Sequence, residues 1–146
     1  MISKLKTELK NKRITILGLG KEGKSSYRFV RRLFPKKKLF LADQKPLSGI
    51  EPPFKKLVAK DSFAKLFLGK NYLNSLESID MIIKTPGIPP TLPEIVRARN
   101  RGVLVTSQTE LFFDYCPGKI IGITGTKGKS TTTSAIFQVL TAGKKK

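Results

Sequence analysis

Short apolar runs alternate along this chain with segments whose apolar residues recur at helical spacing. The apolar runs predict strands at residues 13–19, 37–43 and 103–107, and a further strand within 79–90 that runs into a Pro/Gly turn. The helical spacings predict helices at 24–34, 71–78, 92–102 and 108–116. Residues 61–69 fit either a strand or a helix, and 44–54 are typical of a Pro/Gly-rich loop.

Strands that alternate with helices predict a parallel sheet, because parallel strands must be joined by crossover segments. We therefore expect an α/β fold with a Rossmann-like parallel sheet. Near the end of the chain the pattern predicts one more strand at 118–125, a glycine-rich loop and a helix at 129–143. The Cys-Pro-Gly sequence at 116–118 suggests a boundary between a domain of residues 1–117 and the start of a second domain, residues 118–146.

A first glycine-rich loop follows the first predicted strand. Gly18, Gly20 and Gly23 form a G-x-G-x-x-G pattern that opens a predicted helix, and Asp43 ends the next strand. Such glycines allow the backbone to approach a phosphate at a helix N-terminus, and a carboxylate after the second strand can accept hydrogen bonds from a nucleoside. The pattern predicts a site for a nucleotide or a nucleotide-sugar. The alternative is a tight strand-to-helix turn without a ligand.

A second glycine-rich loop, "GTKGKST" at residues 125–131, lies between a predicted strand and a predicted helix. In a phosphate-binding loop of this kind Lys129 would reach the terminal phosphates, and the hydroxyl of Ser130 or Thr131 would hold Mg²⁺. The strict motif requires glycine at the position of Ile123, so the loop is a variant. A glycine-rich surface loop without a ligand is the simpler alternative.

Charge and composition limit the partners. The net charge of +19, from 29 Lys/Arg and 10 Asp/Glu, favours anionic ligands. The lysines are scattered and the aromatic residues are not interleaved with them, so we do not expect a nucleic-acid partner. Cys116 is the single cysteine, and neither an export signal nor a membrane-spanning run is evident, so we expect a cytoplasmic protein.

Four stretches together resemble the Mur ligase family, and in detail its D-glutamate-adding branch. They are "ILGLGKEGKS" at 16–25, "KTPGIPP" at 84–90, "VTSQTELFF" at 105–113 and "IGITGTKGKSTTT" at 121–133. The resemblance extends from about residue 12 to 143. In this family the position of Ile123 is commonly not glycine, which accounts for the departure from the strict motif.

The resemblance implies an ATP- and Mg²⁺-dependent ligase of peptidoglycan synthesis. It would phosphorylate the carboxylate of UDP-N-acetylmuramoyl-L-alanine, and the amine of D-glutamate would attack the acyl phosphate. The UDP-sugar site would contain Gly18, Gly20, Lys21, Glu22, Gly23, Asp43, Gln44, Lys45 and Gly87. The ATP site would contain Gly125, Thr126, Lys127, Gly128, Lys129, Ser130 and Thr131, with Lys129 as the catalytic residue and Ser130 as the Mg²⁺ ligand.

The family's catalytic centre also requires a histidine, a modified lysine and a central-domain carboxylate for a second Mg²⁺, and this chain has no histidine. We therefore expect a truncated ATPase domain, a monomer, and a chain that does not catalyse the ligation alone. Three alternatives remain open at this point. The chain is a non-catalytic UDP-sugar-binding remnant, an NAD-binding oxidoreductase domain, or another member of the same ligase family.

Overall fold

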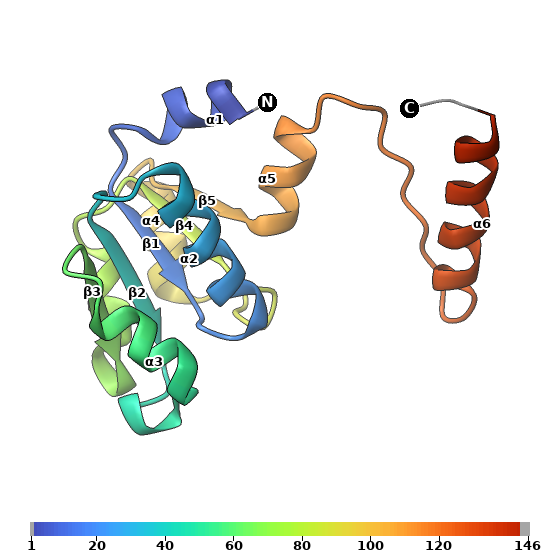
Figure 1. Cartoon of the computed structure of the whole chain (residues 1–146). Coiled ribbons are helices and arrows are strands. Elements are labelled where there is room, and N and C mark those ends of the chain that lie inside the picture. Colours follow the sequence, from blue (N-terminus) through green and yellow to red (C-terminus); the bar gives the residue numbers. More distant parts are fainter. Residues whose placement is uncertain (1, 144–146) are drawn as a thin grey trace. The chain divides into compact units, whose positions relative to one another are not determined.

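The computed structural model describes residues 2–143, which form two compact units that divide between Tyr115 and Cys116. The first unit is an α/β fold built on one parallel sheet (Figure 1). Its strands are β1 (Ile14–Leu17), β2 (Leu39–Asp43), β3 (Ala64–Leu68), β4 (Met81–Lys84) and β5 (Leu104–Ser107). Their order is β3-β2-β1-β4-β5, and every neighbouring pair is parallel. The predicted Rossmann-like sheet is confirmed.

Helical segments join the strands. They are α1 (Ile2–Leu9), α2 (Lys21–Leu33), α3 (Pro52–Ala59), α4 (Pro93–Asn100) and α5 (Gln108–Tyr115), with 3-10 segments η1 (Leu47–Gly49) and η2 (Gly69–Leu76). Residues 61–69, which fitted either type, contain strand β3, and the expected helix at 71–78 is the 3-10 segment η2.

Two of these helices were not predicted. In α1, Leu5 and Leu9 are four residues apart and both are buried, although most of the other residues of the segment are polar. In α3, Phe54 and Val58 have the same spacing, and the helix begins at Pro52, inside the stretch expected to be a loop. Proline is well tolerated in the first turn of a helix, so the two prolines there begin α3.

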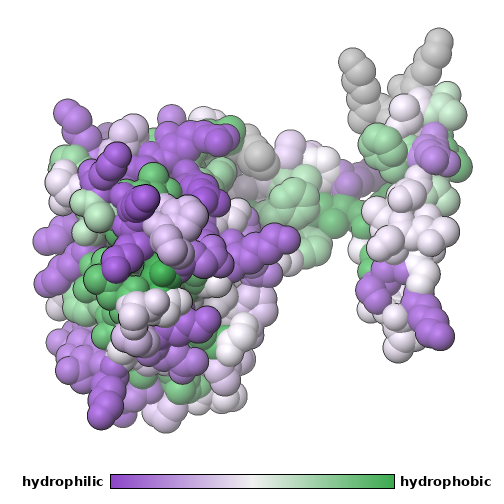
Figure 2. Space-filling view, turned by 60° about the horizontal axis from the view of Figure 1, so that its bottom comes forward, coloured by the Kyte–Doolittle hydropathy of each residue, from purple (hydrophilic) through white to green (hydrophobic). Residues whose placement is uncertain are grey.

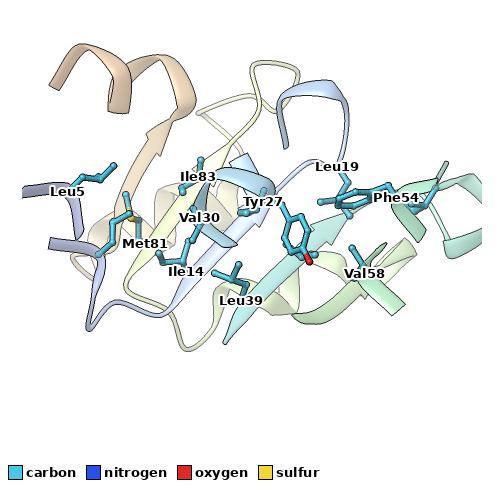
Figure 3. Close-up of a cluster of buried hydrophobic side chains, with 14 residues drawn as sticks. Leu5, Ile14, Leu19, Tyr27, Val30, Leu39, Phe54, Val58, Met81 and Ile83 are labelled. Atoms are coloured by element: carbon cyan, nitrogen blue, oxygen red, sulfur yellow. The ribbon is translucent and has the colours of Figure 1, made fainter. Parts of the chain in front are cut away.

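The sheet is buried on both faces by two separate clusters of apolar side chains. One face packs against α1, α2, α3 and α5 through residues that include Ile14, Val30 and Phe54 (Figure 3). The opposite face packs against η2 and α4 through a cluster centred on Leu17, Ile82 and Ile95. All four residues of β1 are buried, as expected for a central strand with helices on both sides.

The second unit contains one helix, α6 (Lys129–Ala142), preceded by the second glycine-rich loop. The helix was predicted correctly. The strand expected at 118–125 was wrong, because the residues between Tyr115 and Lys129 are neither strand nor helix. An isolated β-segment has no neighbour to satisfy its backbone hydrogen bonds, and the described residues of this unit include no second strand.

Candidate nucleotide-binding site

The first glycine-rich loop turns sharply between β1 and α2. Gly18 has φ of +90°, and a Cβ built on it would lie 2.2 Å from the Thr85 hydroxyl oxygen. A Cβ built on Gly23 would lie 1.8 Å from the carbonyl oxygen of Gly18. Only glycine fits at these two positions, because any side chain would collide with the neighbouring backbone or with the turn after β4. The fold therefore requires glycine at both positions, whether or not a ligand binds to the loop.

Gly20 and Gly87 are different. A Cβ built on either glycine would meet no heavy atom within 4 Å, and neither residue has a left-handed φ. Gly20 is the N-cap of α2, and no side chain caps this helix end. The amides of the first helical turn therefore have no side-chain partner among the described residues, and such amides can bind a phosphate group.

Leu19, in the centre of the loop, anchors the loop to the rest of the fold. Its side chain is only 3% exposed and belongs to the same buried cluster as Phe54 of α3, as Figure 3 shows. Its backbone N–H donates a hydrogen bond of 2.6 Å to the Asp43 carboxylate. Leu19 was not among the predicted site residues, although its apolar side chain between two glycines was a usable signal.

Asp43 connects the first loop with the segment after β2. Its side chain accepts hydrogen bonds from the backbone N–H groups of Leu19, at Oδ2, and of Lys45, at Oδ1, the latter at 2.8 Å. The residue is 9% exposed. Each carboxylate oxygen keeps a further lone pair, so Asp43 both fixes the two backbone segments and retains capacity to accept a hydrogen bond from a ligand.

The turn after β4 closes against the glycine loop. The Thr85 N–H donates to the Leu17 carbonyl oxygen at 3.0 Å, and the Ile88 N–H donates to the Thr85 carbonyl oxygen at 3.1 Å. A Cβ built on Gly18 would lie 3.2 Å from Cδ1 of Ile88 as well as against Thr85. Thr85 and Ile88 therefore form one side of the loop, and Gly87 lies between them in the chain.

These segments meet where the sheet order reverses. The chain proceeds from β1 to β2 on one side and later enters β4 on the other side of β1. The loops that leave β1 and β4 diverge at this point, and open α/β sheets bind ligands in the resulting crevice at the carboxyl ends of their strands. The structure thus brings together the first loop, Asp43, the amide of Lys45 and the turn that contains Gly87.

The remaining predicted residues of this first site are polar and exposed. Lys21 and Glu22 form the first turn of α2, and Gln44 and Lys45 follow β2. In the same region the Lys24 ammonium forms an ion pair of 2.5 Å with Glu51, and this contact lowers the pKa of the Glu51 carboxyl. Lys24 is thereby engaged within the protein, whereas Lys21 and Lys45 have no ion-pair partner among the described residues.

The second glycine-rich loop has its own geometry. Gly125 has φ of +150°, and Gly128, the N-cap of α6, has φ of +78° in the left-handed region. No side chain caps α6, so the first-turn amides of Ser130 and Thr131 are open to a ligand. The Lys129 ammonium bonds to the carbonyl oxygen of Gly125 and lies 3.4 Å from that of Thr126.

All residues from Gly125 to Thr131 are exposed. Glycine torsions, open helix amides and a lysine folded over the loop fit a phosphate chain, and Ser130 offers a hydroxyl oxygen, the donor type that Mg²⁺ prefers. With its ammonium on loop carbonyl oxygens, Lys129 must turn outward to reach a phosphate.

Comparison with known proteins decides the family. The model for "Mur ligase MurD-like, N-terminal domain" matches residues 12–107, which is most of the first unit. The chain belongs to the MurD-like Mur ligases. The matched segment includes the first glycine-rich loop, Asp43 and the turn with Gly87.

Curated relatives extend the match through the second loop. The UDP-N-acetylmuramoylalanine--D-glutamate ligase of Clostridium botulinum strain Hall is 35% identical over 139 residues, covering 94% of this chain. The ligase of the same name from Acetivibrio thermocellus is 35% identical over 140 residues, covering 95% of this chain. In both cases the matched region is 29% of the relative, so the chain spans less than a third of the length of these Mur ligases.

Two features are absent from the described residues, 2–143. No group of three or more His, Cys, Asp or Glu side chains is arranged to hold a metal ion in this part of the chain. None of the helices described is long and apolar enough to cross a membrane.

Proposed function

We propose that this chain is the nucleotide-binding part of an ATP-dependent ligase that joins D-glutamate to UDP-N-acetylmuramoyl-L-alanine in peptidoglycan synthesis. The observation that carries the proposal is the similarity to D-glutamate ligases over 94% of the chain, which includes both glycine-rich loops. The open amides at the switch point of the sheet support it independently, because they suit a nucleotide diphosphate.

We assign the UDP-sugar to residues 1–117. The amides at Gly20, Lys21 and Glu22 would approach the diphosphate, and the open space at Gly87 would allow the second close approach. Asp43, Gln44 and Lys45 would contact the uridine nucleotide, with Asp43 using the acceptor capacity that its two backbone partners leave free. Gly18 and Gly23 would act indirectly, by keeping the loop closed.

We assign ATP to residues 118–146. Backbone amides between Gly125 and Thr131 would surround phosphate oxygens, Lys129 would turn toward the terminal phosphates, and Ser130 would ligate Mg²⁺. ATP would supply the phosphoryl group that activates the substrate carboxylate, and Mg²⁺ would neutralise phosphate charge. We propose a cytoplasmic location, because both nucleotide ligands are found in the cytoplasm. We also expect a monomer.

The first test is direct binding to the 146-residue chain. UDP-N-acetylmuramoyl-L-alanine, UDP and NAD are titrated by calorimetry, and we expect the UDP-sugar and UDP to compete for one site while NAD does not bind. Preferential binding of NAD would contradict the proposal and favour an oxidoreductase domain. Control titrations use the Gly18→Val variant, whose loop cannot close.

A second function, UDP-sugar binding without catalysis, is favoured by one observation. The described residues of the second unit include none that is buried, so nothing in that unit holds Lys129 and Ser130 against an opposing group. We expect the 146-residue chain to bind the UDP-sugar but to release no phosphate in response to D-glutamate. Phosphate release that depends on D-glutamate would show that this chain suffices for catalysis.

A further inference from the structure

Lys84 has an unusual place at the switch point of the sheet. It is the last residue of β4 and lies in register with Leu17, the last residue of β1. The residue is half-buried, and its ammonium donates a hydrogen bond of 3.1 Å to the carbonyl oxygen of Ile88. Its charge is thus held beneath the turn that closes against Gly18.

This ammonium has no carboxylate partner among residues 2–143. The ion pairs within that range are Arg13–Asp80, Lys24–Glu51, Arg31–Asp61 and Arg97–Glu94. An ammonium has three N–H donors, and the one protein hydrogen bond recorded for Lys84 uses only one of them. A partly buried charge without a counter-ion is costly, and an anionic ligand would offset that cost.

The position of Lys84 also matches the geometry of a diphosphate site. The turn that it supports lies against both the glycine loop and the start of α2, because a Cβ built on Gly18 or on Gly23 would lie within 4 Å of Thr85. Helix amides contribute partial positive charge. A full charge from the adjoining turn would complete a site for a group with two negative charges or more.

We propose that Lys84 is a phosphate-binding residue that recognises the diphosphate of the nucleotide ligand from beneath the turn at residues 85–88. This inference rests on the proposed binding of a UDP-sugar and adds Lys84 to a site for which the sequence analysis selected only Gly87 from the segment 84–90. Lys84 discriminates by charge, so it contributes to the binding of UDP and not to the binding of uridine.

The experiment uses the full chain with three substitutions. Lys84→Met removes the charge and keeps an unbranched side chain, Lys84→Arg keeps the charge, and Lys36→Met removes an exposed lysine elsewhere in the first unit as the control. UDP and uridine are titrated into each protein and followed by NMR, and thermal unfolding checks that each variant folds. We expect Lys84→Met to weaken UDP binding on the order of tenfold, the size expected for one charge-assisted hydrogen bond. Uridine binding should stay within about twofold, and Lys84→Arg should retain most of the UDP affinity.

The outcomes separate this inference from the proposed function. If wild type binds UDP and Lys84→Met binds it as tightly as Lys36→Met does, the assignment of Lys84 is wrong and the UDP site stands. If Lys84→Met weakens UDP and uridine equally, Lys84 only supports the turn and the assignment is again wrong. If wild type binds neither UDP nor uridine, the proposed UDP-sugar site fails, and the role of Lys84 fails with it.

Discussion

The α-carbon of Gly23 faces the carbonyl oxygen of Gly18 so closely that a Cβ built on it would lie 1.8 Å from that oxygen. This contact joins the start of α2 to the end of β1 without an intervening side chain. The other two glycines in the region, Gly20 and Gly87, have open space at the same position. The four glycines therefore fall into one pair required by the fold and one pair whose space is free for a ligand.

The first prediction concerns the pair required by the fold. We expect Gly18→Ala and Gly23→Ala each to lower the free energy of unfolding by about 1–3 kcal/mol or more, because both create a collision and Gly18 also has a positive φ. Urea unfolding followed by circular dichroism measures the change. Stability equal to wild type in either variant would mean that the loop can relax at no cost.

The second prediction concerns Gly87. Gly87→Ala should leave the free energy of unfolding within about 0.5 kcal/mol of wild type, because the new methyl group meets no protein atom. It should nevertheless weaken UDP binding, because the methyl group would occupy space that we assign to the diphosphate. Calorimetric titration of UDP tests this. The control is Gly118→Ala, because Gly118 also has open space at its Cβ position and no positive φ, whereas Gly69 has a positive φ. Unchanged UDP affinity in Gly87→Ala would remove Gly87 from the site.

The third prediction separates two roles of Asp43. Asp43→Asn replaces one carboxylate oxygen by an NH₂ group, so either Leu19 or Lys45 would present its backbone N–H to another donor. We expect a loss of about 1–3 kcal/mol in the free energy of unfolding. Hydrogen exchange should accelerate at the amides of Leu19 and Lys45. Glu22→Gln, an exposed change in the first turn of α2, serves as the control and should leave both amides protected.

A contrary result for Asp43 is equally informative. If Asp43→Asn keeps its stability and its slow exchange but loses UDP binding, the carboxylate serves the ligand alone. The structure favours a shared role, because both oxygens already accept backbone hydrogen bonds.

The sequence predicted the sheet because its information is local there. Apolar runs such as 13–19 and the glycine pattern at 18–23 are readable without knowing the fold, and the helix at 129–143 has a clear start at Gly128. Helix α1 was missed because Leu5 and Leu9 are its only buried residues and most of its other residues are polar. The spacing of these two leucines becomes informative only when β4 and α5 are known to lie nearby. The strand expected at 118–125 was wrong although its composition suits a strand. A strand needs a neighbour in a sheet, and the described part of the second unit contains none.

The candidate site divides in the same way. Glycines and phosphate-loop residues follow from spacing, whereas the functions of Leu19, Thr85 and Lys84 depend on contacts across the sheet. Figure 2 shows hydrophilic residues distributed over the visible face of the first unit. Charge alone does not distinguish Lys84 from the other lysines. Its register with Leu17, at the end of β1, does distinguish it.

The last prediction is a pH dependence at the base of α2. The Tyr27 hydroxyl donates a hydrogen bond of 2.6 Å to Asp61, and Nε of Arg31 donates to the same carboxylate at 2.8 Å. Burial and the bond to Asp61 raise the pKa of Tyr27 from 10.0 to about 12. The folded state therefore favours the neutral phenol, so this contribution to stability is complete below pH 10 and is lost as the pH rises through about 12.

Unfolding at several values between pH 9 and 12 tests this relationship, with Tyr27→Phe compared against wild type at each pH. Tyr27→Phe should be less stable than wild type at pH 9, and the difference should shrink as the pH rises toward 12, because only wild type loses the contribution of the neutral phenol. Tyr115→Phe is the matched comparison, because burial and the hydrogen bond to Glu8 also raise the pKa of Tyr115 to about 12. A constant difference between wild type and Tyr27→Phe across this range would mean that Tyr27 titrates alike in the folded and unfolded chain, and that the contact with Asp61 does not hold the phenol neutral.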